Sequence, residues 1–249
     1  MSACPTRRDE AWRYSDLDAV ASLWPVPPAQ VIAVTGEDAR HLIVEGGIHD
    51  FAITLAPAAR MRFDVLNVAP RNGRVAIDVT LGAGADFELN AVQIAGGNST
   101  VEIVTTVRHA APNATSRQTV RSVLAGAATG SYLGKVAVSR GADGTDSEQA
   151  VRAMLLDRTA TANAKPELEI YADDVKCAHG CAIGELDQNA LFYFAQRGLS
   201  PAAARTLLLQ AFVAEVFASA DPALATAASE ALARLDGGAV LHADQSVAR

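Results

Sequence analysis

The sequence has little of several features that mark particular classes of protein. Only three cysteines occur among its 249 residues, and aromatic residues make up 5% of the chain. Cys4, Cys177 and Cys181 are too few and too clustered for a disulfide framework, so we interpret them as buried thiols or metal ligands. No stretch approaches the ~18 uninterrupted apolar residues of a membrane-spanning helix, and the charged N-terminus does not resemble a signal peptide. We therefore expect a soluble, cytoplasmic protein.

Positive charge is also scarce. The chain has 21 Lys and Arg against 28 Asp and Glu, which gives a formal net charge of −7. Binding to nucleic acids or to anionic membranes depends on a basic field at the protein surface. Neither partner is therefore expected. The hydrophobic content of 50% is sufficient for a large core, organised as one domain and a smaller appendage.

Motifs of common enzyme classes are missing or incomplete. Residues Gly130–Lys135 resemble a phosphate-binding loop, but too few residues separate the glycines, and Val136 stands where Ser or Thr is required. No Gly-x-Ser-x-Gly sequence occurs, and four of the five histidines, including His109, have no acid and nucleophile nearby in the sequence. These absences indicate that the protein is not an enzyme in its own right.

Alternation of apolar and polar residues dominates the region from Val31 to Ile183. In the clearest run, Val75, Ile77, Val79 and Leu81 share one face. Similar short runs follow, separated by turns rich in Gly, Asn and Asp. Residues 30–185 are therefore predicted to form a mainly β core. A sandwich, a barrel and a β-helix all remain compatible with this periodicity.

The residues on either side of this core have a different character. Residues 1–29 form a lead-in segment, in which Trp12, Tyr14 and Leu17 predict a strap anchored on the surface. Residues 186–249 predict a helical domain whose three helices begin near Asp187, Ser200–Pro201 and Asp221–Pro222 and whose last helix ends at Gly237–Gly238. The second helix, 202–217, is apolar around most of its circumference, so we expect it to be covered on more than one side.

One segment, Asp173–Cys181, carries a concentration of metal-binding side chains. On an extended strand, Cys177, His179 and Cys181 face the same side. Cys177 and Cys181 would then lie about 13 Å apart, too far to hold one zinc ion through bonds of ~2.3 Å. Cys177 and His179 could both reach a larger cluster with ligands from elsewhere. Alternatively, the cysteines are small buried residues and His179 is a hydrogen-bonded core histidine.

This segment and its surroundings resemble the SufB/SufD family of iron–sulfur cluster assembly proteins. The resemblance is carried by Lys165–Gly180, Ile183–Gly184 and Ala190–Tyr193, and it extends over roughly residues 105–218. Residues Pro5–Leu17 are similar to the segment that leads into the core of SufD proteins, which favours SufD over its paralogue SufB.

The resemblance implies a right-handed parallel β-helix with a C-terminal helical domain. It also implies a SufB-like partner bound through the β-helix and a SufC-like ATPase bound through the C-terminal helices, where we expect Leu208, Phe212 and Val216 to make contact. Cys177 and His179 fall on the family's Cys-x-His pair, which implies that they hold a transient, nascent iron–sulfur cluster together with ligands of the partner. The sequence does not tell whether a flavin is bound, and any flavin would belong to the complex and not to this chain alone.

Two other functions were weighed. A stand-alone homodimer could store or deliver iron or zinc through Cys177, His179 and Cys181 without any partner protein. An enzyme built on a β-helix, such as a lyase or an acyltransferase, would need a groove of clustered acids and bases or a hexapeptide repeat. The sequence shows neither of these features, so the scaffold function is the main expectation.

Overall fold

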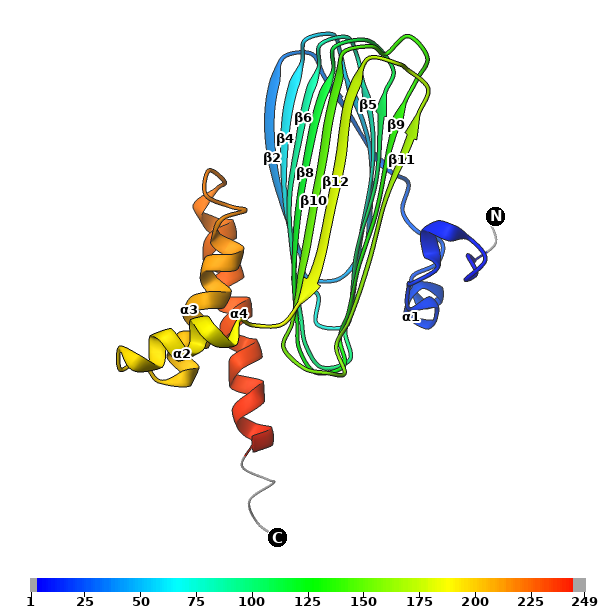
Figure 1. Ribbon diagram of the computed structural model, residues 1–249. Coiled ribbons are helices and arrows are strands. Elements are labelled where there is room, and N and C mark those ends of the chain that lie inside the picture. Colours follow the sequence, from blue (N-terminus) through cyan, green and yellow to red (C-terminus); the bar gives the residue numbers. More distant parts are fainter. Residues whose placement is uncertain (1–3, 244–249) are drawn as a thin grey trace.

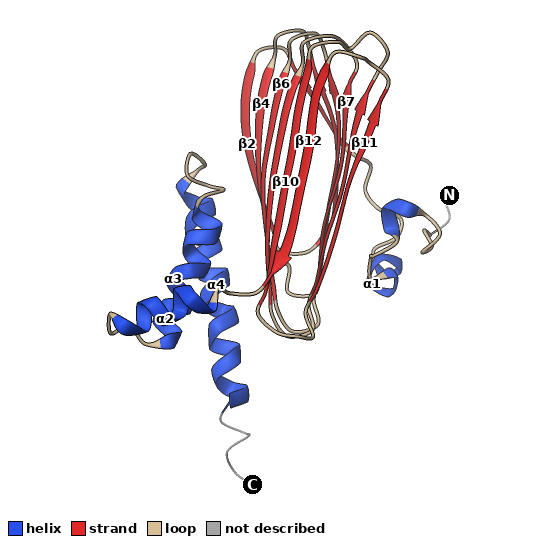
Figure 2. Ribbon diagram, in the orientation of Figure 1, coloured by secondary structure: helices blue, strands red, loops and turns tan. Residues whose placement is uncertain are grey.

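The protein is a parallel β-helix with helices attached at its two chain ends (Figures 1 and 2). The computed structural model describes residues 4–243. Strands β1, β3, β5, β7, β9 and β11 form one sheet in this order, and β2, β4, β6, β8, β10 and β12 form the second. We call them sheet A and sheet B. Because successive strands alternate between the sheets, each pair of strands makes one coil. The prediction of a parallel β-helix is confirmed, and the sandwich and the barrel are excluded.

The strands are of similar length, apart from a short first strand. Sheet A contains β1 (Gln30–Val34), β3 (Gly47–Leu55), β5 (Asn72–Leu81), β7 (Thr100–His109), β9 (Thr129–Val138) and β11 (Thr161–Ile170). Sheet B contains β2 (Glu37–Val44), β4 (Arg60–Asn67), β6 (Asp86–Ala95), β8 (Thr115–Leu124), β10 (Thr145–Leu155) and β12 (Val175–Gly184).

Alternation along each strand sends every second side chain into the space between the sheets, which we call the lumen. The predicted apolar face of β5 lies there: Val75 and Val79 are fully buried and Ile77 nearly so. All neighbouring strands pair in parallel, so equivalent positions of successive coils stack on one another. The lumen is thus filled by files of side chains that run along the β-helix axis.

The content of the lumen changes from apolar to polar along the chain. In the early coils it holds residues such as Phe51, Phe63 and Phe87. In the late coils it holds fully or almost fully buried polar side chains: Thr105, His109, Ser116, Gln118, Ser147 and Gln149. Most of these groups bond to one another, as expected for polar groups withdrawn from water. The coils closest to the Cys177 segment therefore carry a polar interior.

The C-terminal helices are α2 (Gln188–Gln196), α3 (Pro201–Ala214) and α4 (Pro222–Ala243). The side chains of Asp187 and Ser200 cap α2 and α3, as the sequence predicts. The predicted end of the last helix at Gly237–Gly238 is wrong, because α4 continues to Ala243. Glycine inside a helix costs only about 1 kcal/mol relative to alanine, so two glycines need not end a helix. No helix within residues 4–243 is long and apolar enough to cross a membrane.

Helices α3 and α4 cover part of the outer face of sheet B. Their apolar side chains pack on Leu66, Val92, Ile94 and Val123, which lie near the C-terminal ends of β4, β6 and β8. Figure 1 shows this helical unit beside one end of the sheet, joined directly to β12. The lumen at β12 is not covered by it.

The N-terminal segment lies on sheet A and contains the short helices η1 (Glu10–Trp12) and α1 (Leu17–Ser22). The Trp12 ring stacks on the guanidinium of Arg74 at 3.9 Å, and Arg74 forms a buried ion pair with Glu102 at 3.6 Å. An ion pair between Glu10 and Lys165 joins the segment to β11. The predicted aromatic strap is therefore confirmed, and it covers a buried pair of charges.

Protonation of His109 should make the stability of the protein depend on pH. Burial lowers the pKa of His109 to about 4, from 6.5 for an exposed histidine. The unfolded chain therefore takes up this proton at higher pH than the native protein does. The contribution of neutral His109 to the free energy of unfolding is fully present above pH 6.5 and is lost as the pH falls towards 4. From these values we expect a loss of about 2 kcal/mol between pH 8 and pH 5.

The measurement is urea unfolding at both pH values for the wild type and for His109→Gln. Glutamine can still bond to Ser116, which lies 2.9 Å from the imidazole Nε2, but it does not titrate. The variant should lose less stability between pH 8 and pH 5 than the wild type, by about 2 kcal/mol. If both proteins lose the same free energy of unfolding, protonation of His109 is not the cause of the loss.

Candidate functional site

Strand β12 is the last strand of sheet B, and one of its two edges has no neighbour. It pairs with β10 in parallel from Val175 to Gly184 without interruption. No strand of the described chain pairs with its other edge. Its backbone N–H and C=O groups on that side are therefore free to pair with another chain. The last coil is an open end of the β-helix, visible in Figure 1 as the yellow strand in front.

Cys177, His179 and Cys181 share the lumen side of β12. Their partners in the register on β10 are Ser147, Gln149 and Val151, all of which are buried in the lumen. Gly180 does not break the alternation, since the pairing continues through it. Because no further coil lies over them, His179 and Cys181 are exposed and Cys177 is half-buried. These three side chains thus face the open end of the β-helix instead of a closed core.

The Cys177 thiol lies against a small apolar cluster that includes Val136, Val138 and Leu168. Burial, and to a smaller extent the Asp146 carboxylate, raises the pKa of Cys177. The group is therefore a neutral thiol at pH 7 in the free chain. A bound metal ion would displace this proton, because metals bind the thiolate form.

The ligand set on β12 is incomplete. No group of three or more His, Cys, Asp or Glu side chains among the described residues is arranged to hold a metal ion. Asp173 and Asp174 lie in the bend before β12, where the carbonyl of Asp174 accepts a hydrogen bond from Gly144 N–H at 2.7 Å. A metal centre at Cys177 and His179 would therefore need ligands from another molecule.

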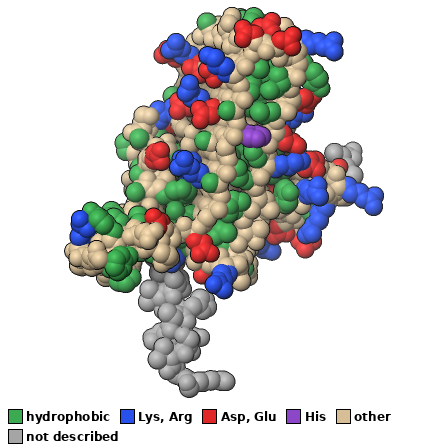
Figure 3. All heavy atoms as spheres, in the orientation of Figure 1, with side chains coloured by type: hydrophobic (Ala, Val, Ile, Leu, Met, Phe, Trp, Pro, Cys, Tyr) green, Lys and Arg blue, Asp and Glu red, His purple; other side chains and the backbone are tan. Residues whose placement is uncertain are grey.

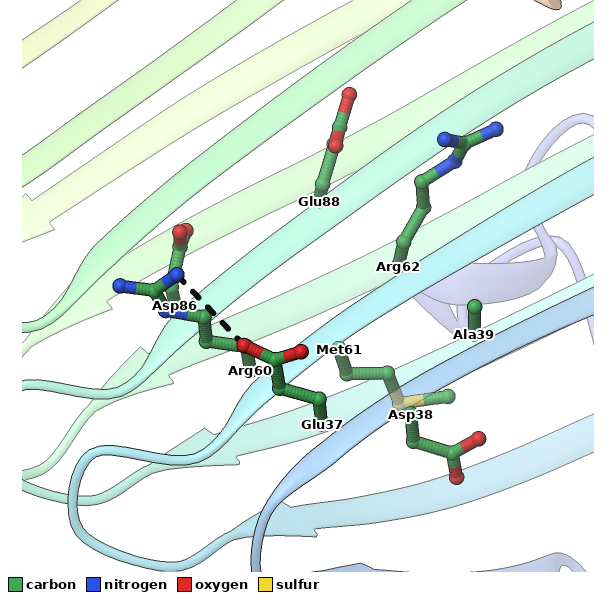
Figure 4. Close-up of a pocket in the computed structure, with 8 residues that line it drawn as sticks. All are labelled: Glu37, Asp38, Ala39, Arg60, Met61, Arg62, Asp86 and Glu88. Carbon is green, nitrogen blue, oxygen red and sulfur yellow. Dashed lines mark ion pairs between the residues drawn. The ribbon is translucent and has the colours of Figure 1, made fainter. Parts of the chain in front are cut away.

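The opposite end of sheet B is different in character. Charged side chains of strand β2 form ion pairs. Arg40 pairs with Asp38 of the same strand at 2.9 Å, and Glu37 pairs with Arg60 of β4 at 3.8 Å. A hollow of about 410 Å³ lies at this end of the sheet. It is lined by acidic residues of β2 and β6 and by arginines of the intervening strand β4 (Figure 4). Charged edge strands are a common protection against unwanted pairing. In contrast, Lys176 is the only Lys, Arg, Asp or Glu residue in β12.

The residues expected to contact the ATPase lie in different environments. Val216 is only 6% exposed and belongs to the core between the helices and sheet B. Phe212 and Leu208 are half-buried, and the Phe212 ring lies 5.6 Å from the Arg121 guanidinium. The sheet already covers much of the apolar circumference of α3, which explains why these side chains are not free. Val216 therefore cannot contact a partner without rearrangement of the core.

Other side chains of the same helices are exposed and apolar. They are Phe192 and Tyr193 on α2 and Leu207 on α3, with exposures of 66%, 50% and 44%. Helix α2 buries none of its side chains. Figure 3 shows hydrophobic side chains at the surface of the lobe where α2 lies in Figure 1, among charges of both signs. We call these three side chains the helical patch.

Sequence reasoning missed the polar side chains directly below the Cys177–Cys181 segment. Gln149 lies under His179 in the register, and Gln118 lies under Gln149. The available signal was a repeat of about thirty residues, which aligns Ser116 with Ser147 and Cys177, and Gln118 with Gln149 and His179. These residues can be aligned with one another only when the length of one coil is known.

Comparisons with known proteins agree with this architecture. Residues 34–212 match the SufBD core domain of the SUF system for iron–sulfur cluster assembly. The chain is 36% identical to Protein ABCI7, chloroplastic, of Arabidopsis thaliana over 137 residues, which are 55% of this chain and 29% of that protein. It is 30% identical to the iron–sulfur cluster assembly protein SufD of Escherichia coli over 135 residues, 54% of this chain and 32% of that one.

A third relative is the iron–sulfur cluster assembly SufBD family protein slr0076 of Synechocystis, 32% identical over 166 residues, which are 66% of this chain and 37% of the relative. The chain spans about a third of the length of the curated relatives it matches. The family match extends from the first coil into α3 and covers more than half of the chain. This protein therefore belongs to the SufBD family of iron–sulfur cluster assembly proteins.

Proposed function

We propose that this chain is a SufD-like scaffold subunit, which builds a nascent iron–sulfur cluster together with a SufB-like paralogue and a SufC-like ATPase. One observation carries the proposal. Cys177 and His179 lie side by side on the lumen face of a terminal strand, exposed or half-exposed, and without enough neighbours to complete a metal site. Such an arrangement suits a cargo that is held between two proteins and then released.

The chemistry of the two side chains fits this cargo. Thiolate and imidazole are ligands that iron–sulfur clusters accept, and iron in a cluster needs more protein ligands than two adjacent side chains supply. On binding, iron would displace the proton of the Cys177 thiol. The missing ligands would come from the partner that covers the open end. Release would follow when the two proteins separate or shift.

The edge of β12 supports pairing with a second β-helix. Its outward-facing residues are small apart from Lys176, namely Ala178, Gly180, Ala182 and Gly184. By contrast, β11 at the same end carries Lys165, Glu167 and Pro166, which disfavour edge pairing. A related β-helix that meets this end across a local two-fold axis would place its own terminal strand against β12 in antiparallel orientation. Cys177 and His179 would then lie at the junction.

The helical patch is proposed as the contact for the ATPase. Exposed aromatic and aliphatic side chains on a protein surface often mark an interface with another protein. The patch lies on the helical unit, away from the lumen opening. The ATPase and the paralogue could therefore bind at the same time.

The central test is His179→Ala in the complex with both partners. We expect it to lower cluster loading by at least about tenfold, because removal of an imidazole from an incomplete shell leaves an open iron position. The melting temperature should stay close to that of the wild type, since His179 is exposed and forms no core contact. Loading is measured by absorbance and iron content after anaerobic reconstitution with ferrous iron and sulfide.

Cys181→Ala is the matched control on the same face of the same strand. We expect it to reduce loading much less than His179→Ala, since Cys181 lies about 13 Å along the strand from Cys177. Normal loading by the His179→Ala complex would refute the proposal. Stable loading by the isolated chain, with equal sensitivity to Cys177, His179 and Cys181, would favour the stand-alone homodimeric metal protein instead.

A second test separates docking of the ATPase from stability of the helical unit. Leu207→Asp changes an exposed side chain, so we expect it to alter the free energy of unfolding by less than about 0.5 kcal/mol but to weaken binding of the ATPase. Val216→Asp buries a charge and should destabilise the fold by at least ~3 kcal/mol. Unchanged binding by Leu207→Asp in a pull-down or titration experiment would place the docking surface elsewhere.

A further inference from the structure

Four buried polar side chains form a connected network in the lumen of the late coils. The hydroxyl of Thr105 donates to Oε1 of Gln118 at 2.8 Å, and the hydroxyl of Tyr132 donates to the same oxygen at 3.0 Å. Nε2 of Gln149 donates to the Tyr132 hydroxyl at 3.1 Å. All four residues are at most 2% exposed. The network reaches from β7 to β10, one strand short of β12.

Gly134 makes room for this network. A Cβ atom at this position would overlap the hydroxyl of Tyr132. Because Gly134 has no side chain, the ring of Tyr132 on the same strand can extend along the lumen and place its hydroxyl between Gln118 and Gln149. The position of the hydroxyl is thus set by the backbone as well as by its bonding partners.

The orientation of the Gln118 amide and the single proton of the Tyr132 hydroxyl together set the orientation of the Gln149 amide. A tyrosine hydroxyl has one proton, and that of Tyr132 goes to Gln118. Gln149 must then offer its NH2 group to Tyr132, which leaves its carbonyl oxygen directed elsewhere. This Oε1 atom is buried and has no hydrogen-bond partner within residues 4–243. A buried acceptor without a donor is costly, by about 1–3 kcal/mol, so a nearby donor would be used.

The residue stacked on Gln149 at the open end is His179. The two are partners in the parallel register, and both point to the lumen side of sheet B. Neighbouring strands lie about 4.8 Å apart, so a side-chain oxygen at one position is within reach of a ring at the next. The imidazole of His179 forms no hydrogen bond with the described part of the chain. The unpartnered oxygen of Gln149 and the unbonded ring of His179 thus lie at stacked positions of neighbouring strands.

We propose that Gln149 is a positioning residue for His179: its carbonyl oxygen accepts the proton of one ring nitrogen and turns the other nitrogen, without a proton, towards the open end. This inference rests on the proposed role of His179 as a cluster ligand. Metal-binding histidines commonly have their second nitrogen fixed by an acceptor in this way, which sets the tautomer and the ring orientation. The buried network of Thr105, Gln118 and Tyr132 would then serve to hold Gln149 in place.

The ring of His179 can be observed directly in the full-length chain. With 15N-labelled histidine, long-range 1H–15N spectra at about pH 8 report the tautomer of each neutral ring, and His179→Gln assigns the signal among the five histidines. We expect one tautomer to predominate by about tenfold in the wild type, as a hydrogen bond to one nitrogen requires. Tautomer populations like those of an unbonded, solvent-exposed histidine in the wild type would overturn the proposal, whether or not any variant folds.

Gln149→Met and Gln118→Met provide a matched pair of variants. Both replace a fully or almost fully buried amide of the same network by an apolar side chain of similar length, but only Gln149 lies next to His179. We expect Gln149→Met to shift the tautomer populations to those of an unbonded, solvent-exposed histidine and Gln118→Met to leave the wild-type preference unchanged. Gln118 accepts two hydrogen bonds, so its variant should be destabilised at least as much. Equal shifts in both variants would indicate a purely structural role.

Cluster loading of the complex gives an independent measurement. With the paralogue, the ATPase, ferrous iron and sulfide, Gln149→Met should load about tenfold less cluster than the wild type, and Gln118→Met should load normally. If the wild-type complex loads no cluster, the proposed function fails while the ring spectra still decide the Gln149 contact. If Gln149→Met changes the tautomer but not the loading, the contact exists and the positioning role is refuted.

Discussion

The parallel pairing between coils is the constraint on which the rest of this structure depends. Each strand forms hydrogen bonds with the strand two positions later in the sequence. Neither sheet therefore closes on itself, and each sheet ends in strands with one unpaired edge. The two ends of sheet B differ in how they stop. Strand β2 is lined with paired charges, whereas β12 presents small, mostly uncharged residues together with Cys177 and His179. An edge of this kind is suited to continuation by another protein.

The same pairing connects the surface site to the interior. Equivalent positions stack from coil to coil, so a lumen-side residue of β12 such as His179 lies directly over the lumen residue of β10. The lumen becomes polar in these late coils, and its hydrogen bonds fix side chains one strand below the opening. Polar groups in a core are costly unless they are bonded, and here the bonds lead towards the site. Thus His179 on the terminal strand lies over an ordered polar layer, while Cys177 on the same strand packs against a small apolar cluster.

Local patterns in the sequence predicted the strands, the helix caps at Asp187 and Ser200 and the common face of Cys177, His179 and Cys181. They could not choose among the β architectures, because alternation is the same in a sandwich, a barrel and a β-helix. The position of Gln149 under His179 depends on coil length, which is a long-range property of the register. Likewise, an apolar helix face does not reveal what covers it: Val216 packs on the protein's own core, while Leu207 is exposed.

We propose that the open end at β12 is the surface that joins the paralogue. Hydrogen–deuterium exchange of the full-length chain, measured alone and with a SufB-like paralogue, tests it most directly. Unpaired edge amides exchange fast, and pairing slows them. On binding of the paralogue, we expect slower exchange along β12, around Cys177–Ile183, with no change along β2. Protection at β2 or on the outer face of sheet A, with β12 unchanged, would contradict it.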